Sequence, residues 1–362
     1  MAVTNDLVTD RRVMRHASTL REAGCEVLLI GKNELRVKAK RGWRFYAEYN
    51  VRLWWRLLWT KMDVVWANDT DTLLAAFLAA RMKRRKLVMD AHELFPEVPE
   101  LVGRERVKRV WETIERRLMP KCDAMLTVCQ SIADYYRARY GVKMTVVRNI
   151  NDELSIMNEE LADATNYSSL FTLHSSLKML LYQGCVNKGR GVDWAIDALE
   201  FLPECRLVVA GGGDLLEEMK AYAAQKPWAE KISFLGRMKP EELERLTRSC
   251  GVRLAGSRFP QAVGMVMLED MGLSYHYALP NRIGDFVAAG VPMVVSDLPE
   301  MARVVRRFGV GEVMDAPTPQ ALAEAVKRVL AREWTDDDFA AAREDMDWKK
   351  EKKKLIEIIE TI

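Results

Sequence analysis

Strands that end in glycine decide the fold of this chain. One such end is YQGCVNKGRG at 182–191, where an apolar run stops and a helical pattern begins. Two more follow, VVAGGGD at 208–214 and FLGR at 234–237. Glycines at one edge of a parallel sheet let an anion approach the backbone, and a helix N-terminus adds partial positive charge. Lys188 and Arg190 would supply full charges to a diphosphate, so three such ends in succession favour a binding site over ordinary turns.

Working outward, short β-branched runs alternate with helical patterns throughout the sequence. Strands are predicted at 1–3, 26–30, 64–66, 86–90, 124–128 and 144–147, and then at 178–183, 205–210, 232–235, 263–268, 292–296 and 311–314. Helices are predicted near 9–23, 44–60, 70–82, 104–118 and 130–139. This alternation predicts an α/β protein with two doubly wound, Rossmann-like parallel-sheet domains that face each other across a cleft.

The polar, turn-rich stretch 151–176 is predicted to connect the two domains. The first domain is expected to comprise 1–160 together with an amphipathic C-terminal helix at 345–362. The second is expected at 177–344. A length of 362 residues suffices for two such cores, at about 150 residues per domain.

Composition and charge limit the classes of function. No signal peptide or run of about 18 apolar residues is recognisable, and six scattered cysteines favour reduced thiols, so we expect a cytoplasmic protein. Residues 1–150 carry 29 Lys+Arg against 18 Asp+Glu, a charge of +11, whereas the remainder carries −8. The basic half would attract an anionic membrane or nucleic acid. The sequence shows no aromatic and basic platform of the nucleic-acid-binding kind, and we expect no such partner.

The most specific stretch is LSYHYALPNRIGDFVAAGVP at 273–292. Pro280 at the start of a helix leaves the N–H groups of its first turn available for phosphate. Asp285, about one turn further on, is suited to accept hydrogen bonds from ribose hydroxyls. An ordinary buried helix does not explain the polar edge formed by Asn281, Arg282 and Asp285.

These stretches resemble the retaining glycosyltransferases of family 4, which have the GT-B fold. The resemblance covers most of the chain, through residues 5–13, 90–95, 184–191 and 278–282. The last stretch is similar to a bacterial subgroup whose motif reads ALPNK, then Leu or Ile, an acid and Tyr. The resemblance implies transfer of a sugar from a nucleotide-sugar donor to a lipid-linked or glycan acceptor, as in cell-envelope polysaccharide synthesis.

The resemblance also implies roles for single residues. Arg190 matches the phosphate-binding cation, and Asp285 matches the second acid of the E-x7-E motif, which contacts the ribose. His92 matches a histidine that reaches across the cleft to the donor sugar or phosphate. The first acid of the motif falls at Tyr277, so either Tyr277 or the nearby Glu269 would meet the sugar hydroxyls.

The implied sites are therefore as follows. The catalytic residues are His92 and Arg190. The donor-binding residues are Gly184, Lys188, Gly189, Gly212, Gly236, Arg237, Tyr277, Ala278, Leu279, Pro280, Asn281, Arg282 and Asp285. The acceptor-side residues are Asn5, Asp6, Asp10, Arg11 and Glu93.

Charge considerations suggest a mechanism without a metal or another cofactor. Breaking the bond between sugar and nucleotide leaves negative charge on the diphosphate and oxocarbenium character on the sugar. Arg190, Arg282 and the helix start at Asn281 would stabilise the leaving charge. No Asp-x-Asp sequence, which could hold a metal, lies at a strand end that would face the donor. Residues 69–71 are Asp-Thr-Asp, but they lie in the first domain at a predicted helix start, where Asp69 is interpreted as an N-cap.

A second signal lies in the basic half, where residues 41–61 contain four Trp and four Arg. Trp, Leu and Arg together suit a helix at the lipid headgroup boundary, and the basic runs 81–86 and 104–121 would add attraction. We expect Trp54, Trp55, Arg56 and Trp59 to contact the inner face of a membrane. The alternative is a helix packed on the sheet of the first domain, with some of the Trp side chains buried.

Two other functions are compatible with this pattern. A sugar-nucleotide epimerase of the same fold is disfavoured by the motifs of the first domain and by residues 278–282. A non-catalytic subunit that binds nucleotide or membrane is supported by the missing first acid at Tyr277.

Overall fold

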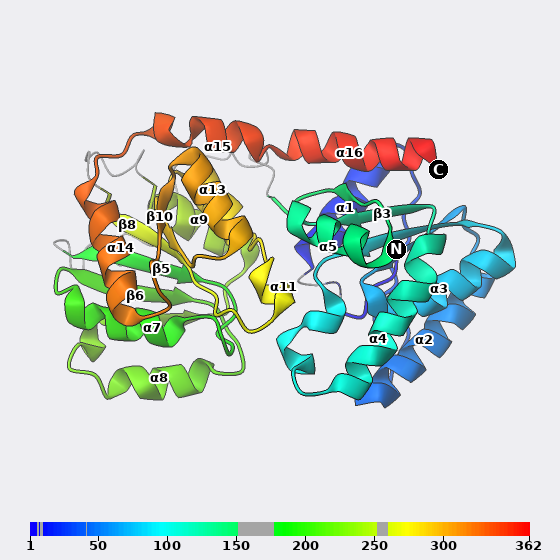
Figure 1. Cartoon of the computed structure of the whole chain (residues 1–362), viewed down its shortest axis with the longest axis horizontal. Coiled ribbons are helices and arrows are strands. Elements are labelled where there is room, and N and C mark those ends of the chain that lie inside the picture. Colours follow the sequence, from blue (N-terminus) through cyan, green and yellow to red (C-terminus); the bar gives the residue numbers. More distant parts are fainter. Residues whose placement is uncertain (6, 8–9, 41, 151–176, 252–259) are drawn as a thin grey trace. The chain divides into compact units, whose positions relative to one another are not determined.

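The computed structural model describes residues 1–5, 7, 10–40, 42–150, 177–251 and 260–362. The chain divides into two compact units (Figure 1). The first comprises 1–149, 272–277 and 349–362, and the second comprises 150–271 and 278–348. Residues 272–277, which the sequence predicts in the second domain, group with the first unit. The predicted connection at 151–176 lies outside the described residues.

The first unit contains a four-stranded parallel sheet. Its strands follow the order β1 (Val64–Asn68), β2 (Lys86–Ala91), β3 (Ala124–Thr127) and β4 (Thr145–Val146). The strands predicted at 1–3 and 26–30 are wrong as strands, because only Ala2 pairs, through single bridges to Ile30 and Ala67. The chain bends at Thr4, directly after this contact, so no longer ladder can form.

Helices surround this sheet, and the five helices predicted for the first half are confirmed to within two residues at each end. They are α1 (Arg11–Glu22), α2 (Gly42–Trp59), α3 (Thr70–Lys83), α4 (Glu105–Leu118) and α5 (Gln130–Tyr140). Shorter elements are η1 (Phe95–Glu97), η2 (Pro99–Leu101), η3 (Met119–Lys121) and α11 (Leu273–His276).

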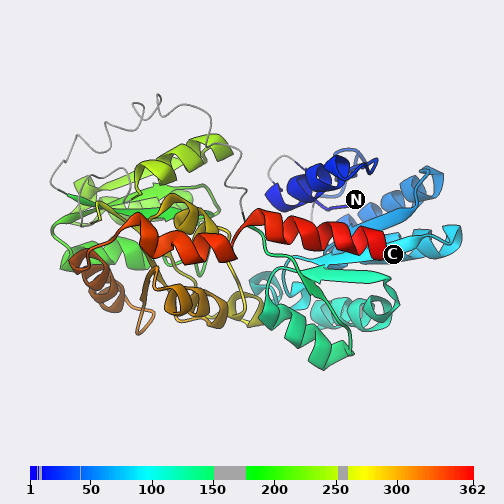
Figure 2. The same ribbon diagram turned by 90° about the horizontal axis from the view of Figure 1, so that it is seen from above.

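The last helix, α16 (Trp348–Thr361), belongs to the first unit from Lys349 onward (Figure 2). The carboxylate of its fully buried Glu351 accepts from the backbone N–H of Arg148 at 3.0 Å and pairs with the guanidinium at 2.8 Å. Leu355 and Ile358 lie on the buried face. The amphipathic pattern of the sequence thus corresponds to a helix with one packed face.

The second unit contains a six-stranded parallel sheet in the order β10-β9-β8-β5-β6-β7. The strands are β5 (Lys178–Gln183), β6 (Cys205–Ala210), β7 (Ile232–Gly236), β8 (Ala262–Val266), β9 (Met293–Val295) and β10 (Gly311–Val313). The strand order reverses between β5 and β8, and ligands of such sheets bind beyond the carboxyl ends of the strands at this point. The predicted architecture of two parallel α/β sheets is confirmed.

The helices of this unit are α7 (Val192–Ala198), α8 (Leu216–Ala224), α9 (Pro240–Ser249), α12 (Arg282–Ala289), α13 (Pro299–Phe308), α14 (Pro319–Ala331) and α15 (Ala340–Asp345). Single 3-10 turns lie at η6 (Leu199–Phe201), η7 (Ala229–Lys231) and η8 (Asp336–Phe339).

Two glycines let backbone segments meet where β5 and β6 end. A Cβ on Gly211 would lie 1.7 Å from the carbonyl oxygen of Gly184, and one on Gly213 would lie 2.4 Å from that of Val186. Gly212, between them, is different, because a Cβ there would meet only Arg237, at an ordinary 3.5 Å. Gly211 and Gly213 are therefore needed for packing, while the Cβ position of Gly212 is open.

This difference predicts opposite outcomes for two adjacent substitutions. Gly211→Ala should lower the free energy of unfolding by at least about 1–3 kcal/mol, because its methyl group must displace backbone. Gly212→Ala is the matched control and should unfold close to the wild-type midpoint in urea. Equal midpoints for the two variants would contradict the close approach of the two loops.

Candidate active site

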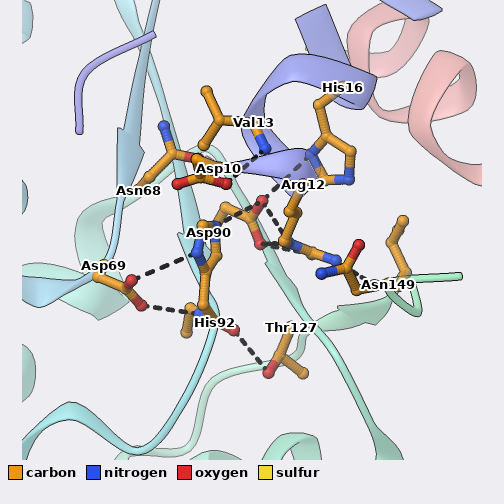
Figure 3. A network of polar contacts seen from close by, with 12 residues as sticks. Asp10, Arg12, Val13, His16, Asn68, Asp69, Asp90, His92, Thr127 and Asn149 are labelled. Atoms are coloured by element: carbon orange, nitrogen blue, oxygen red, sulfur yellow. Dashed lines mark hydrogen bonds and ion pairs between the residues drawn. The ribbon is translucent and has the colours of Figure 1, made fainter. Parts of the chain in front are cut away.

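In the first unit, charged side chains gather where β1 and β2 end (Figure 3). Asn68 and Asp90 are partners in the ladder, and Asp69 and His92 follow. The carboxylate of Asp69 accepts from the backbone N–H of His92 at 2.8 Å, and its other oxygen lies 3.4 Å from His92 Nδ1. The predicted capping role of Asp69 is wrong. It stands at the N-cap position of α3 but makes no capping bond, because its carboxylate is engaged by His92.

Asp90, which is fully buried, is the centre of this cluster. Arg12 donates to it from Nη2 at 2.6 Å and from Nε at 3.1 Å, and donates from Nη1 to the carbonyl of Val147 at 2.7 Å. His16 Nδ1 lies 3.2 Å and His92 Nε2 lies 3.5 Å from the same carboxylate oxygen. Helix α1, strand β2 and the end of β4 are thus joined through Arg12 and Asp90.

The electrostatics of this cluster distinguish the two histidines. Burial opposes a charge on His92, but the carboxylates of Asp69 and Asp90 outweigh it and raise the pKa to about 9. Burial and then Arg12 lower the pKa of His16 to about 4. Burial also opposes the charge on Asp90, yet Arg12 and His92 hold its pKa well below the ordinary value. At neutral pH, His92 is therefore a cation and His16 is neutral.

The acceptor-side residues lie before and after this cluster in the sequence. Asn5 Nδ2 donates to Asp10 at 2.5 Å, and Asp10 caps α1 by accepting from the N–H of Val13 at 3.0 Å. Both side chains thus fix the start of α1. Arg11 and Glu93 are half-buried, and Asp6 lies outside the described residues.

In the second unit, the loop 184–191 lies at the point where the strand order reverses. Gly184 and Gly189 adopt positive φ angles of 135° and 73°, which favour glycine. The N–H of Val186 donates to Gly212 O at 2.9 Å, and the N–H of Glu269 donates to Gly189 O at 2.9 Å. Backbone hydrogen bonds thus continue beyond the ends of the strands, and the loops after β5, β6 and β8 form a continuous surface, here called the glycine floor.

Most of the predicted donor-binding side chains on this floor are accessible to solvent. Lys188 and Arg237 are exposed, Arg190 is half-buried, and the alternative acid Glu269 is exposed. Space is open at the Cβ position of Gly236. The edge therefore presents cations around a bare backbone, as an anion site requires.

Helix α12 is tied to the end of β5 by Arg282. The guanidinium of this buried residue donates to the carbonyl of Gln183 at 2.8 Å. The amide of Gln183 donates to Asp285 at 3.3 Å and accepts from Thr247 at 2.8 Å. Sequence reasoning missed Gln183 as the link, although it ends the strand that carries the glycine loop. Within the described chain, the N–H groups of Asn281 and Arg282 donate to no backbone carbonyl, which leaves the start of α12 available for a ligand.

The remaining residues of this stretch divide between the units. Ala278, Leu279 and Pro280 are half-buried and belong to the second unit. Tyr277 belongs to the first unit, where its carbonyl accepts from the thiol of Cys129 at 3.2 Å.

Helix α2 combines a packed face with an exposed one. Tyr49, Leu53 and Leu57 are buried, whereas Trp55 and Trp59 are 57% and 74% exposed. Trp54 is half-buried and Arg56 is exposed. A groove of about 450 Å³ is lined by Glu34, Leu35, Val51, Arg52, Trp54, Trp55, Arg56 and Trp59. Among the described residues, no helix is long and apolar enough to cross a bilayer, and His, Cys, Asp and Glu side chains form no group of three suited to a metal ion.

Comparison with known proteins gives the family. Residues 9–152 match the model described as Glycosyltransferase Family 4, and residues 178–332 match that described as Glycosyl transferases group 1. The chain belongs to glycosyltransferase family 4, and the family expected from the sequence is thus confirmed.

Individual relatives are distant. A phosphatidyl-myo-inositol mannosyltransferase of Mycobacterium leprae is 28% identical over 194 residues, which cover 51% of this chain and 47% of that protein. An uncharacterised glycosyltransferase of Methanocaldococcus jannaschii is 26% identical over 214 residues, 57% of this chain and 50% of the relative. The chain therefore spans about half the length of these two proteins.

Among solved structures, HepE of Anabaena in complex with UDP-glucose matches with a TM-score of 0.76 at 14% identity. The match covers 100% of this chain and 98% of that one. At this identity the likeness concerns the fold, and it confirms the predicted GT-B class.

The charge on His92 predicts a dependence of stability on pH. Its pKa is raised from 6.5 to about 9, so the folded protein binds an extra proton between these values. The resulting stabilisation is complete below pH 6.5 and is lost as the pH rises through 9, by up to about 1.4 kcal/mol per pH unit. His92→Gln should lack this loss in urea unfolding compared between pH 6.5 and pH 9. His276→Gln, outside the network, should retain the wild-type loss, and a parallel decline in His92→Gln would argue against a charged His92.

Proposed function

We propose that this protein is a retaining, metal-independent glycosyltransferase that uses a nucleotide-sugar donor. The second unit binds the donor, and the first unit binds the acceptor. The observation that carries this proposal is the carboxyl end of three neighbouring strands, β5, β6 and β7, each followed by or ending in glycine, with Lys188 and Arg190 in the loop after β5 at the reversal of strand order. Residues 278–282 serve as a donor loop of the ALPNK-type subgroup.

The chemistry follows from where charge develops. Departure of the nucleotide leaves negative charge on the diphosphate, which Arg190, Lys188 and the start of α12 stabilise. Arg282 shapes this site, because its guanidinium already holds Gln183. Asp285, fixed by the same glutamine, accepts from the ribose hydroxyls. His92 adds the cation of the first unit, near the reacting sugar.

A uridine diphosphate donor is supported by the solved neighbours. HepE was crystallised with UDP-glucose, and a trehalose-phosphate synthase from Burkholderia vietnamiensis is described as UDP-forming. A thermal-shift screen with UDP-, GDP-, ADP- and TDP-sugars tests the choice. A donor at a hundred times its dissociation constant should add about 2.7 kcal/mol of stability.

Arg190→Ala should weaken both donor binding and turnover. A charge-assisted contact is worth about 1.5–3 kcal/mol, so kcat/KM should fall roughly ten- to a hundredfold. The fall in kcat/KM is measured from the rate at which nucleoside diphosphate is released from the donor selected by the screen. Arg306→Ala removes an exposed arginine of α13 and is the control. If the folded Arg190→Ala protein keeps wild-type kinetics, Arg190 is not part of the site. If the wild-type protein binds donors but releases no nucleotide, it is a non-catalytic subunit.

We further propose that the acceptor is linked to a lipid and that the first unit lies on an anionic membrane. Exposed apolar residues recur every four positions on two helices that pack together, at Val51, Trp55 and Trp59 of α2 and at Leu74, Leu78 and Met82 of α3. Val107 and Val110 are exposed on α4, which packs against α3. Basic residues accompany these stripes, as in proteins that bind the headgroup region. The mannosyltransferase of M. leprae, named for phosphatidyl-myo-inositol, supports a lipid acceptor.

Vesicle binding separates the apolar and the charged contributions. Arg56→Glu with Lys61→Glu should abolish binding to vesicles of anionic phospholipid at low salt, since each basic residue near the surface contributes about 1 kcal/mol. Trp55→Ala with Trp59→Ala should remove the part of the binding that persists at high salt. Sedimentation with vesicles measures both.

Arg52 is left intact in this test, because it pairs with Glu48 at 2.7 Å and supports α2. Lys220→Glu with Lys327→Glu makes the same charge change on the second unit and should leave vesicle binding unaltered. Donor affinity should be unchanged in all these variants. The membrane proposal fails if the wild-type protein ignores anionic vesicles at low salt.

A further inference from the structure

Asp69 has a backbone conformation that its residue type disfavours. Its φ and ψ angles are 61° and 166°, a region occupied almost only by glycine, and such strain costs about 1–3 kcal/mol. Two hydrogen bonds hold the residue there. Its N–H donates to the carbonyl of Asp90 at 2.9 Å, and its carboxylate accepts from the N–H of His92 at 2.8 Å. The strained conformation thus places Asp69 in contact with both Asp90 and His92.

The imidazole of His92 lies between two carboxylates, with Asp69 at 3.4 Å from Nδ1 and Asp90 at 3.5 Å from Nε2 (Figure 3). Asp90 also pairs with Arg12, so its charge is shared between two cations. The ion pair of Asp69 is with His92. Burial raises the pKa of Asp69 itself, and the charge on His92, its ion-pair partner, opposes this shift.

Among the other ionisable groups near this site, Asp10 also acts on Asp69, whereas His16 and Asp71 are largely neutral near pH 7. Burial and Arg12 lower the pKa of His16 to about 4. Burial and then Asp69 raise the pKa of Asp71 to about 8, and Asp71 accepts from Thr4 at 2.7 Å. Neither group therefore replaces the charge of Asp69.

We propose that Asp69 is the positioning residue for His92, fixing the backbone and the ring of His92 and keeping the ring cationic for sugar transfer. The inference rests on the role that the proposed function gives His92. Asp69 acts through His92 and does not itself touch the donor. Its carboxylate supplies both a hydrogen-bond acceptor and a charge, and two substitutions separate these contributions.

Asp69→Asn retains an acceptor for the His92 N–H but removes the charge. Asp69→Gly removes the side chain and relieves the strained backbone. In both, the pKa of His92, followed by NMR of histidine-labelled protein, should fall by about one unit or more. The alkaline limb of the kcat profile should move to lower pH by the same amount, with KM for the donor little changed. Asp69→Gly should be at least as stable to urea as Asp69→Asn, although it is equally impaired in turnover.

Asp123→Asn is the matched control. Asp123 makes the same two kinds of contact at the opposite end of β2, accepting from the N–H of Leu87 at 2.9 Å and pairing with Lys86 at 3.0 Å. Its substitution should leave both the His92 pKa and the kcat profile unchanged. UDP release from UDP-glucose, or from the donor selected by the screen, gives the profile.

An unchanged His92 pKa in Asp69→Asn overturns the inference whatever the activity. A shifted pKa with an unchanged kcat profile also overturns it, because the charge would then have no part in transfer. Failure of the proposed function itself looks different, since the wild-type protein would then release no nucleotide from any donor while its His92 titration still responded to Asp69→Asn.

Discussion

The structure of the first unit depends on the burial of one carboxylate, that of Asp90. A buried charge is costly unless it is paired and hydrogen-bonded, so the surrounding elements must supply its partners. Arg12 meets this requirement from α1 and simultaneously binds the carbonyl of Val147. Asp90 lies next to the last residue of β2 and also contacts the ring of His92. Stability and site geometry therefore both involve this ion pair.

The second unit is governed by a constraint of another kind, the close approach of backbone to backbone. Gly211 and Gly184 lie so near each other that no side chain fits between them, and Arg282 joins the end of β5 to α12. The glycine-containing loops and the start of α12 are therefore held together by direct contacts. Such preorganisation favours electrostatic stabilisation of a leaving group, because the charges do not reorganise during the reaction.

The sequence was informative where signals are local. Apolar runs that end in glycine predicted the strands β5 to β7, and 278–282 indicated the family. Contacts between distant residues could not be predicted. Arg12 and Asp90 are 78 positions apart, and the sequence around one gives no indication that it pairs with the other. The prediction that Asp69 caps α3 was wrong for a different reason. An aspartate at a helix start usually accepts from the first turn of the helix, but this carboxylate accepts from His92 instead, so the tertiary contact overrides the local preference.

That override is itself informative about function. The cluster contains two cations, Arg12 and His92, against the acids Asp69 and Asp90, so it is close to neutral as a whole while its charges stay separated. A chain selected for stability alone would place glycine at a φ of 61° and a neutral side chain beside β2. The strained backbone of Asp69 lowers stability at every pH, and the stabilisation that the charged imidazole provides is lost at alkaline pH. Places where a sequence breaks its own local rules tend to be functional sites, and here the departure concentrates at His92.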